Sequence, residues 1–395
     1  MAALVAVAAA IVGISTKEQR SLGPKFVALD RIARLTDPVY LTQPPGPGSQ
    51  LYVVQRQGVV RIISSDHLLG RPFLDIHSLV GSQAPANAGM SSIAFAPDYR
   101  RSGLFYVSYT NAKDTLRIVE YRRSAADPLV ADPDSARLVL SIPEPTPMHH
   151  SGFIVFGHDG DLYVATGDGG PRGDPANRAQ DRNTLLGKIL RIDPRRGTPY
   201  SIPAGNPFVG RPGRPEIWAY GFQNPRRLAF DDPTKTIGIG DAGDEHYEEV
   251  DYLPIAKARG ANFGWPAFEG FRTFRGGLTR RETALPALAY PIDPGCRVTG
   301  GYLLRDPRLA RIRGREIFGD YFFGDYCTGR VYAFRPRKGR KPGKLRSFRF
   351  RLPHLVSFGE DNQGRIYVIT QRGRPRHGKP TLGSIYRLVP RRKPL

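Results

Sequence analysis

Short apolar stretches alternate with turn residues along almost the whole chain, and they occur in pairs. A turn such as Asp-Gly or Asn-Gln-Gly often precedes the first stretch, and the second shows the period-two alternation of a pleated strand. We expect the first members to be inner strands, namely Leu51–Val54, Leu104–Tyr109, Leu162–Thr166, Ile237–Asp241, Tyr321–Gly324 and Ile366–Thr370. We expect their outer partners to be Gly58–Ile63, Leu116–Tyr121, Gly187–Ile192, Glu249–Leu253, Gly329–Phe334 and Gly383–Leu388.

The expected fold is an all-β, six-bladed β-propeller of four-stranded antiparallel blades. A single blade cannot bury both faces of its sheet, so the blades must stack around an axis and close on themselves. With 44 Gly and 36 Pro, nearly every window long enough for a helix is interrupted. We assign residues 25–390 to one propeller and residues 391–395 to a basic tail. Long loops after Asp168, Ile192 and Trp265 point to a functional site at the axial mouth.

The formal net charge of +22 raises the question of a nucleic-acid or anionic-membrane partner. Arg far outnumbers Lys, and the Arg residues are dispersed over loops and strand ends rather than gathered in one stripe. The one dense basic run, Arg335–Arg351, lies between two strand signals and fits a solvated loop. We therefore expect a generally basic surface and no nucleic-acid partner.

The start of the chain and its two cysteines suggest an exported protein. Residues 1–20 hold an Ala/Val/Ile stretch that is too short for a comfortable membrane span, which fits a signal peptide or an N-terminal signal anchor. The mature protein would then be periplasmic, extracellular or membrane-anchored on the outer side. There, Cys296 and Cys327 can form a disulfide that contributes about 3 to 4 kcal/mol, and two buried thiols are the alternative.

A pair of histidines in front of a strand is the first candidate for chemistry. His149 and His150 open a His-His-Ser-Gly loop, which is followed by Phe-Gly-His-Asp-Gly and the strand at residues 162–164. A loop imidazole at the mouth of a propeller can accept a proton from a substrate hydroxyl near neutral pH. Most loop histidines, however, are solvated or hydrogen-bonded structural residues, and that alternative stays open from the residues alone.

Two further segments combine glycines with carboxylates. The Thr-Gly-Asp-Gly-Gly turn at 166–170 leads to Gly173 and Asp174, and a later turn holds Gly243 and Asp244 just past a strand. Glycines let the backbone approach a planar ligand closely, and oxygens of the later turn can converge on calcium. Turn-rich crossings between blade strands would explain the same residues without a ligand, and no EF-hand spacing is present.

The order of these segments resembles the glucose/sorbosone dehydrogenase family of pyrroloquinoline quinone (PQQ) sugar dehydrogenases, from about Val39 to Leu388. Further elements of the resemblance are Leu-Leu-Gly-Lys-Ile-Leu-Arg-Ile, Trp-Ala-Tyr-Gly-X-X-Asn-Pro and Asn-Phe-Gly-Trp-Pro. It implies a PQQ cofactor across the propeller mouth, with calcium on its quinone and carboxylate oxygens. It also implies that His149 takes the proton from the anomeric hydroxyl of an aldose while hydride passes to the quinone. An external electron acceptor would be a further partner.

The resemblance also implies a set of site residues. Those for the cofactor are Asn87, Gly173, Asp174, Gln223 and Asn224, and those for calcium are Gly243 and Asp244. Gln223 stands where the family usually has Arg, Asn87 where Gln or Glu is usual, and Cys327 lies in a stretch where the well-known enzymes have Lys. A neutral amide can donate a hydrogen bond but contributes no charge. No replacement for the usual cofactor clamp is obvious in the sequence.

Three functions are compatible with these residues. The one that we favour is PQQ-dependent oxidation of an aldose to its lactone. A non-catalytic propeller that binds carbohydrate or protein is the alternative; Gln223 and Cys327 favour it, whereas His149 argues against it. A metal-dependent lactonase on a similar propeller would need a cluster of acidic side chains around the axis, which the sequence alone does not assemble.

Overall fold

The computed structural model describes residues 27–80, 89–292, 297–312, 315–337, 342–348, 350, 352, 354–373 and 380–391. Its helices are short and number five in these ranges: α1 (His77–Val80), α2 (Tyr99–Ser102), α3 (Ile255–Ala258), η1 (Arg280–Glu282) and η2 (Pro307–Leu309). None of them is long and apolar enough to cross a membrane. The predicted leader at 1–20 lies outside the described residues, as do Asn87 and Cys296.

Six antiparallel sheets form the blades, and the strands of each blade run in the order stated from the innermost outward. Blade 1 contains β2 (Pro38–Thr42), β3 (Leu51–Gln55) and β4 (Val59–Ser64), with β5 (His67–Leu68) and β6 (Leu74–Asp75) both paired to β4. Blade 2 contains β7 (Gly89–Phe95), β8 (Leu104–Thr110), β9 (Thr115–Arg123) and β10 (Ala131–Pro143). Blade 3 contains β11 (Phe153–Phe156), β12 (Leu162–Thr166), β13 (Lys188–Ile192) and β14 (Ile217–Tyr220).

The other three blades follow the same plan. Blade 4 contains β15 (Pro225–Asp231), β16 (Thr236–Asp241), β17 (Tyr247–Pro254) and β20 (Leu288–Pro291). Blade 5 contains β21 (Val298–Leu303), β24 (Tyr321–Asp325), β25 (Val331–Phe334) and β26 (Arg346–Phe348). Blade 6 contains β27 (Leu355–Glu360), β28 (Ile366–Gln371), β29 (Leu382–Pro390) and β1 (Val27–Thr36). The two remaining ladders pair β18 (Phe268–Glu269) with β19 (Arg272–Thr273), and β22 (Arg311–Ile312) with β23 (Arg315–Glu316).

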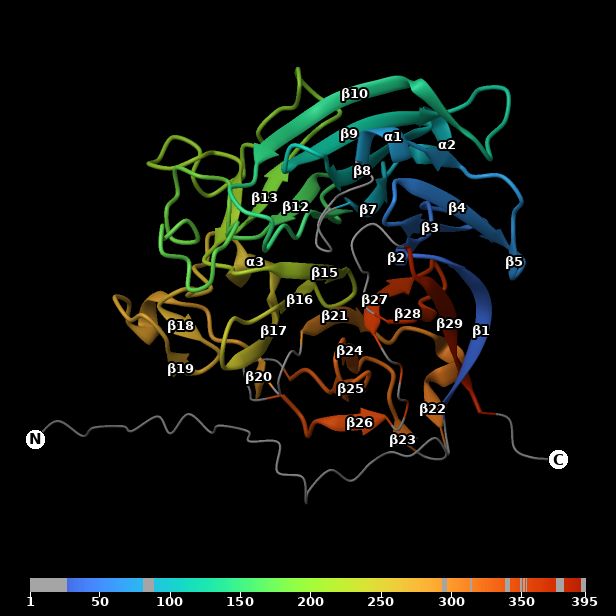
Figure 1. The fold of residues 1–395 in the computed structure, drawn as a ribbon. Coiled ribbons are helices and arrows are strands. Elements are labelled where there is room, and N and C mark those ends of the chain that lie inside the picture. Colours follow the sequence, from blue (N-terminus) through green and yellow to red (C-terminus); the bar gives the residue numbers. More distant parts are fainter. Residues whose placement is uncertain are drawn as a thin grey trace, which may run out of the picture.

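The blades are set radially around a common axis (Figure 1). Each innermost strand packs against the next: β2 against β7, β7 against β11, β11 against β15, β15 against β21, β21 against β27, and β27 against β2. Blade 6 is built from both ends of the described chain, since β1 pairs with β29 from Val27↔Pro390 to Thr36↔Leu382. The all-β, six-bladed propeller predicted from the sequence is confirmed.

The radial position of the strands differs from the sequence-based prediction. The strands predicted as inner strands, such as Leu162–Thr166, are the second strands of their blades, and their predicted outer partners are the third strands. The true innermost strands are buried on both faces between neighbouring blades. β2 and β27, for example, are each buried at every position but the last, and therefore show no alternation of polar and apolar residues. The loop with His149 consequently leads directly into an innermost strand, β11.

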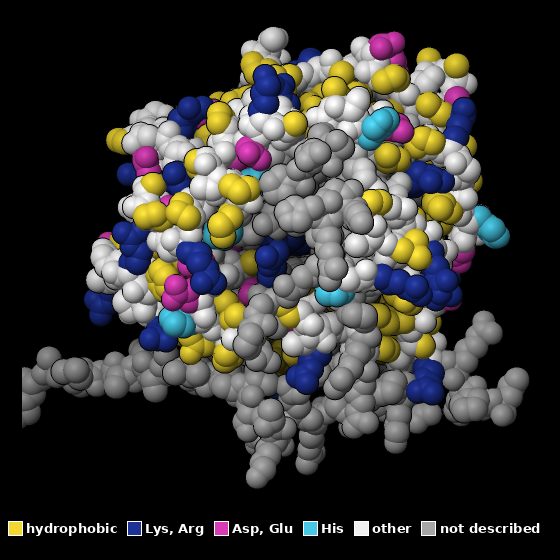
Figure 2. Space-filling view, in the orientation of Figure 1, with side chains coloured by type: hydrophobic (Ala, Val, Ile, Leu, Met, Phe, Trp, Pro, Cys, Tyr) yellow, Lys and Arg dark blue, Asp and Glu magenta, His cyan; other side chains and the backbone are white. Residues whose placement is uncertain are grey.

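Aromatic pairs join neighbouring blades. Tyr52 of blade 1 meets Phe95 of blade 2 with ring centroids 4.7 Å apart, and Tyr163 of blade 3 meets Phe230 of blade 4 at the same distance. Such edge-to-face pairs contribute about 0.5 to 1.5 kcal/mol each beyond the area that they bury. On the outside, Lys and Arg side chains are scattered among hydrophobic and acidic ones on the face that Figure 2 shows.

One side chain crosses the propeller axis. Arg227 of blade 4 donates from Nη2 to the carbonyl of Val39 in blade 1 at 2.6 Å, and from Nε to Oγ of Ser357 in blade 6 at 2.8 Å. Its guanidinium lies 5.1 Å from the ring centroid of Phe153 and 5.6 Å from that of Tyr40. Because blades 1 and 4 stand on opposite sides of a six-bladed ring, Arg227 forms a floor across the axial channel.

Candidate functional site

Segments from several blades meet at one end of the propeller, which we call the mouth. Because neighbouring strands are antiparallel, the stretch that leads into an innermost strand and the turn that follows a second strand lie at the same end of a blade. In blade 3 these segments carry His149 and Asp168. In blade 4 they carry residues 223–224 and 243–244. The structure therefore brings predicted site residues from two neighbouring blades to the mouth.

His149 forms a hydrogen bond with a fully buried carboxylate. Its Nδ1 lies 2.7 Å from Oδ1 of Asp168, and the indole N–H of Trp265 donates to Oδ2 of the same carboxylate at 2.8 Å. The backbone N–H of Gly170 also donates to Oδ1 at 2.8 Å. The Asp168 side chain is 0% exposed, whereas the imidazole keeps 13% of its surface exposed. A carboxylate on Nδ1 fixes the ring and leaves Nε2 to exchange a proton with a ligand, as in acid–base histidines.

The His149 loop is held tightly against its surroundings. His149 and Ser151 both have left-handed backbone conformations, with φ of 56° and 41°. The turn after β12 approaches the loop so closely that a Cβ on Gly167 would lie 1.6 Å from the carbonyl oxygen of His149. On the other side, the hydroxyl of Ser151 donates to the carbonyl of Pro225 in blade 4. The imidazole is thus positioned by two blades.

The segment with Gln223 and Asn224 surrounds the carboxylate of Asp241. The two backbone N–H groups donate to its oxygens at 3.0 and 2.6 Å, and the carbonyl of Gln223 accepts from the N–H of Asp168 at 2.8 Å. Burial raises the pKa of Asp241 to about 7 against the opposing effect of these two hydrogen bonds. Among the described residues, neither amide atom of the buried Gln223 side chain has a hydrogen-bond partner, nor does Oδ1 of Asn224. Unpaired buried polar atoms of this kind call for an explanation, and a ligand at the mouth would supply one.

The predicted cofactor turn and the predicted metal turn are in direct contact. The N–H of Gly173 donates to Oδ2 of Asp244 at 2.9 Å. Burial raises the pKa of Asp244, while Gly173 and His149 lower it, so the imidazole lies within electrostatic range of this carboxylate. Asp174, in contrast, faces its own loop: its oxygens accept from the N–H groups of residues 178 and 179, both at 2.9 Å.

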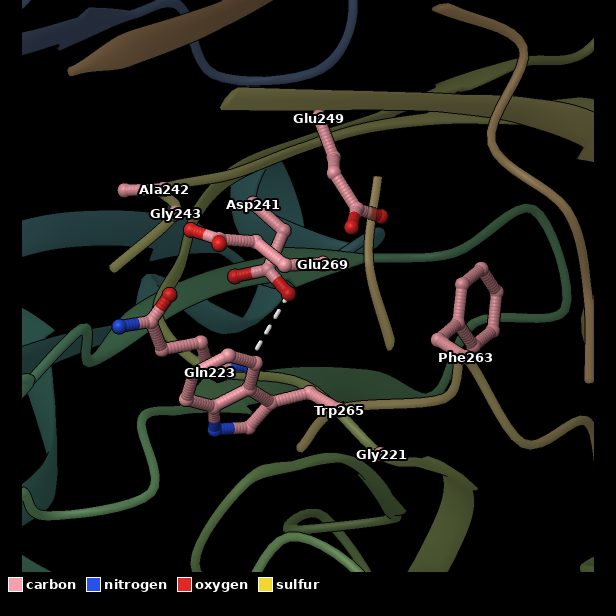
Figure 3. Close-up of a pocket in the computed structure, with 9 residues that line it drawn as sticks. All are labelled: Gly221, Gln223, Asp241, Ala242, Gly243, Glu249, Phe263, Trp265 and Glu269. Atoms are coloured by element: carbon pink, nitrogen blue, oxygen red, sulfur yellow. Dashed lines mark hydrogen bonds between the residues drawn. The ribbon is translucent and has the colours of Figure 1, made fainter. Parts of the chain in front are cut away.

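A small pocket beside these residues has an empty volume of about 230 Å³. Figure 3 shows the carboxylates of Asp241, Glu249 and Glu269 around it, together with the amide of Gln223 and the indole of Trp265. Glu249 stands directly opposite Asp241 in the β16–β17 ladder. Burial raises the pKa of Glu249, and the neighbouring charge of Asp241 raises it further. The carboxylates of this pocket are thus more stable when they are protonated, or when a cation lies beside them, than when they are charged and unpaired.

The calcium prediction for Gly243 and Asp244 stays a prediction. Both backbone N–H groups donate to carboxylates, that of Gly243 to Glu248 at 3.2 Å and that of Asp244 to Glu269 at 2.7 Å. Over the described ranges, no group of three or more His, Cys, Asp or Glu side chains has the arrangement of a metal site. A cation at this turn would therefore be held largely by backbone oxygens, as the resemblance implies. Asn87 is outside the described residues, and so is Cys296, which leaves the disulfide to Cys327 as a prediction.

Sequence reasoning missed the partners of His149. It placed Asp168 in a glycine-rich turn and Trp265 before a long loop, and nothing local connects two residues 97 positions apart. One positional signal was present: a carboxylate at or just after the end of a second strand recurs at Asp168, Asp241 and Asp325. Each of these side chains accepts hydrogen bonds from backbone N–H groups nearby.

The fold matches that of a solved sugar dehydrogenase. The PQQ-bound form of Aldose Sugar Dehydrogenase (Adh) from Streptomyces coelicolor aligns with a TM-score of 0.69, covering 92% of this chain and 99% of that chain. The two sequences are 23% identical, so the likeness shows the fold alone.

Sequence relatives include a protein named for an interaction. Hedgehog-interacting protein of Mus musculus is 28% identical over 409 residues, which cover 97% of this chain and 55% of that protein. HIPL1 protein of Arabidopsis thaliana is 30% identical over 394 residues, which cover 78% of this chain and 55% of that protein. The chain thus spans about half the length of these relatives. The Glucose / Sorbosone dehydrogenase family model matches residues 35–341, most of the chain. The chain therefore belongs to the glucose/sorbosone dehydrogenase family.

Proposed function

We propose that this protein is an exported dehydrogenase that oxidises the anomeric hydroxyl of an aldose to the lactone, with PQQ as hydride acceptor and calcium as a second cofactor. The observation that carries the proposal is the imidazole of His149 at the mouth, held through Nδ1 by the buried carboxylate of Asp168. A buried carboxylate on Nδ1, with part of the imidazole still exposed at the mouth, is the arrangement of an acid–base histidine, and it supports this role. Family membership supports the same chemistry.

The residues at the mouth have separate roles in this reaction. Nε2 of His149 accepts the proton of the anomeric hydroxyl as hydride leaves C1. Asp168 keeps the imidazole in one orientation and stabilises the imidazolium that results, since its carboxylate remains 2.7 Å from Nδ1. Trp265 holds the second oxygen of that carboxylate. Bound PQQ would supply the quinone that takes up the hydride.

The polar atoms of the mouth fit such a cofactor. The unpaired amide of Gln223 and Oδ1 of Asn224 are available to the carbonyl, ring N–H and carboxylate groups of a flat quinone. Asp241 and Asp244, whose pKa values are raised, would be stabilised in their charged form by a nearby divalent cation. We therefore place the cofactor between residues 223–224 and the Gly173–Asp244 contact.

Reconstitution of the purified protein with PQQ and calcium tests the proposal. We expect aldose-dependent reduction of an electron-accepting dye, and we expect His149→Ala to lower its rate by about 10²- to 10⁴-fold. His158→Ala is the matched control, because His158 lies in the β11–β12 turn at the opposite end of the same blade and is 29% exposed. Dye reduction that is absent with every aldose, or equal in the two variants, would defeat the proposal.

The alternative is a propeller that binds a protein or carbohydrate without turnover. The observation that favours it is the 28% identity, over 97% of this chain, to a relative whose name describes an interaction with Hedgehog. It predicts that His149→Ala and His158→Ala both leave ligand binding unchanged, and that neither PQQ nor calcium raises the melting temperature. A thermal shift of the wild type with PQQ would therefore separate the two functions before any sugar is added.

A further inference from the structure

Arg226 stands at the axial end of the mouth. It lies in β15, the innermost strand of blade 4, at a bulge where the register shifts between Pro225 and Arg227. A bulge re-aims the side chain of the extra residue. The carbonyl of Pro225, directly before it, accepts a hydrogen bond from the hydroxyl of Ser151 in the His149 loop. Arg226 is therefore one residue from the point where the two blades of the candidate site are joined.

Three more arginines approach the same end of the axis. Arg227 forms the floor of the channel through its contacts with Val39 and Ser357. Arg56 directly follows β3 in blade 1, and Arg297 directly precedes β21 in blade 5, so that both belong to the mouth by the topology of their blades. Blades 1, 4 and 5 thus each contribute at least one arginine at this end of the axis, and the charges of Arg56, Arg227 and Arg297 all act on Arg226.

These positive charges act on one another. Burial, together with the charges of Arg297, Arg227 and Arg56, lowers the pKa of Arg226 to about 9. Burial likewise lowers the pKa of Arg227 to about 10. Like charges that reduce each other's pKa lie close enough to repel. An anion placed among them would relieve this repulsion.

Arg226 has no partner for its own charge. The side chain is only partly exposed, and among the described residues no hydrogen-bond acceptor or carboxylate meets its guanidinium. In contrast, Arg227 has three hydrogen-bond acceptors. A partly desolvated guanidinium without an acceptor is costly, and a carboxylate that accepts two parallel N–H bonds is its best-matched partner.

We propose that Arg226, with Arg56 and Arg297 around it and Arg227 below, forms a carboxylate-binding site on the propeller axis beside His149. A carboxylate held at this site would orient the ligand that carries it against the imidazole. The carboxylate can come from the tricarboxylate cofactor of the proposed function, on which this source depends, or from an acidic sugar. In the first case Arg226 replaces the charge that is missing at Gln223, three residues before it in the sequence.

Calorimetry without any sugar turnover tests the site. The probes are PQQ with calcium, and galacturonate compared with galactose, titrated into wild type, Arg226→Gln and Arg226→Lys. Loss of a charge-assisted, two-pronged contact should weaken carboxylate binding by about 10- to 100-fold, and Lys should restore part of it as a single-point charge. Arg101→Gln removes an equal charge from an 87% exposed side chain in α2, at the other end of blade 2, and should change nothing.

Each result of this experiment has a clear meaning. Weaker PQQ binding by Arg226→Gln, with Arg101→Gln unchanged, supports a cofactor site, whereas an effect confined to galacturonate supports an acidic-sugar site. Equal affinities in wild type and a folded Arg226→Gln variant, or no binding of either carboxylate to the wild type, would overturn the inference. Binding that depends on Arg226 without sugar-dependent dye reduction would sink the proposed function and leave this site standing.

Discussion

At the residue scale, the charge of Asp168 is what turns a loop histidine into a candidate base. Three donors surround its carboxylate, namely the imidazole of His149, the indole of Trp265 and the N–H of Gly170. A buried carboxylate that accepts several hydrogen bonds is held rigidly in one position. The imidazole can therefore take up a proton without losing its orientation.

Replacing Asp168 with Asn should lower the rate of proton transfer to His149 without changing the affinity for the cofactor. The amide keeps the shape of the side chain but cannot stabilise an imidazolium, so we expect dye reduction to fall by about 10²- to 10⁴-fold while PQQ affinity changes little. Trp265→Phe removes only the outer donor and should cost about tenfold. Steady-state kinetics together with a cofactor titration separates rate from affinity. An Asp168→Asn enzyme as fast as the wild type would show that His149 does not act as a base.

A second histidine–carboxylate pair, His150 and Glu144, is buried next to the first in the same loop. His150 places Nε2 2.7 Å from the carbonyl of Thr146, so this nitrogen donates, and Nδ1 faces Oε2 of Glu144 at 3.2 Å. Burial raises the pKa of Glu144 to about 9 and lowers that of His150. The two shifts agree with a protonated carboxyl group beside an uncharged ring.

This pair predicts a pH dependence of stability. The folded protein keeps the proton of Glu144 up to about pH 9, whereas the unfolded chain releases it near 4.5, so the free energy of unfolding should decrease as pH rises between these values. The slope should approach about 1.4 kcal/mol per pH unit from this group alone. Urea midpoints at pH 6 and pH 8 measure it. Glu144→Gln, which is neutral throughout, should show a smaller slope, and equal slopes would contradict the assignment.

At the scale of elements, the close approach of the β12 turn to the His149 loop is the contact most sensitive to a single atom. Gly167→Ala would place its Cβ 1.6 Å from the carbonyl oxygen of His149, and only a shift of the loop can relieve that clash. We expect a loss of about 1 to 3 kcal/mol in stability, and a loss of dye reduction of about 100-fold as the imidazole moves from its position.

The control for this substitution is Gly70→Ala, which adds the same atom where nothing lies within 4 Å. It should change neither the melting temperature nor the rate. Should Gly167→Ala retain the wild-type rate, the loop would be more adaptable than the packed arrangement implies.

Element patterns also explain which parts of the structure the sequence could predict. Third strands such as β4 and β9 alternate buried and partly exposed residues. Their pairing with the second strands could therefore be predicted from the period of two in the sequence. Innermost strands were not readable, because packing between two blades removes the alternation; β21 adds two consecutive glycines, at 300 and 301. At the candidate site, His149 could be named from its motif, but its contact with Asp168, and that of Asp168 with Trp265, join segments distant in sequence.

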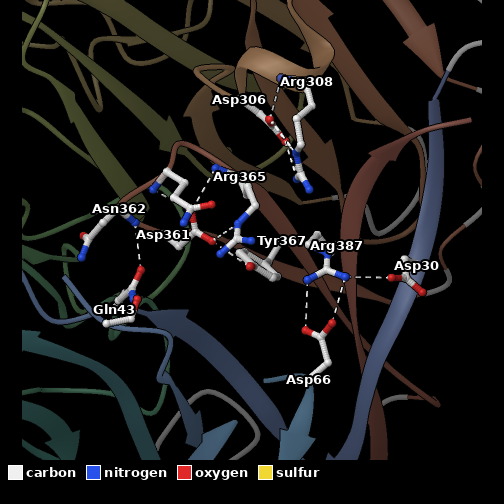
Figure 4. A network of polar contacts seen from close by, with 12 residues as sticks. Asp30, Gln43, Asp66, Asp306, Arg308, Asp361, Asn362, Arg365, Tyr367 and Arg387 are labelled. Carbon is white, nitrogen blue, oxygen red and sulfur yellow. Dashed lines mark hydrogen bonds and ion pairs between the residues drawn. The ribbon is translucent and has the colours of Figure 1, made fainter. Parts of the chain in front are cut away.

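At the scale of the whole molecule, the ring is closed by the two ends of the described chain. β1 buries Val27, Ile32 and Leu35 against blade 6 and forms a ladder with β29. Arg387 of β29 adds ion pairs to Asp30 of β1 at 2.9 Å and to Asp66 of blade 1 at 3.0 Å (Figure 4). The closure thus combines a buried apolar seam, formed by Val27, Ile32 and Leu35, with a polar clasp on the outside, formed by the ion pairs of Arg387.

Removing the seam and removing the clasp should have very different effects. Deleting residues 27–36 loses three buried aliphatic side chains, worth about 1.5 to 3 kcal/mol each, and uncovers the edge of β29, so we expect a much lower melting temperature and aggregation. Arg387→Ala breaks pairs with half-exposed carboxylates and should lower the free energy of unfolding by about 1 kcal/mol or less. Thermal unfolding and size-exclusion chromatography measure both. A deletion as stable as the wild type would show that blade 6 closes without β1.

The position of Arg227 on the axis affects how a substrate can enter and leave the propeller. Its guanidinium bridges opposite sides of the ring, so under the proposed function we expect a sugar to enter and leave by the mouth. Under the proposed function, an oxidised sugar would then have to depart before an electron acceptor could take its place over the cofactor. The architecture itself would therefore make oxidation of the sugar and reoxidation of the cofactor occur one after the other at the same opening.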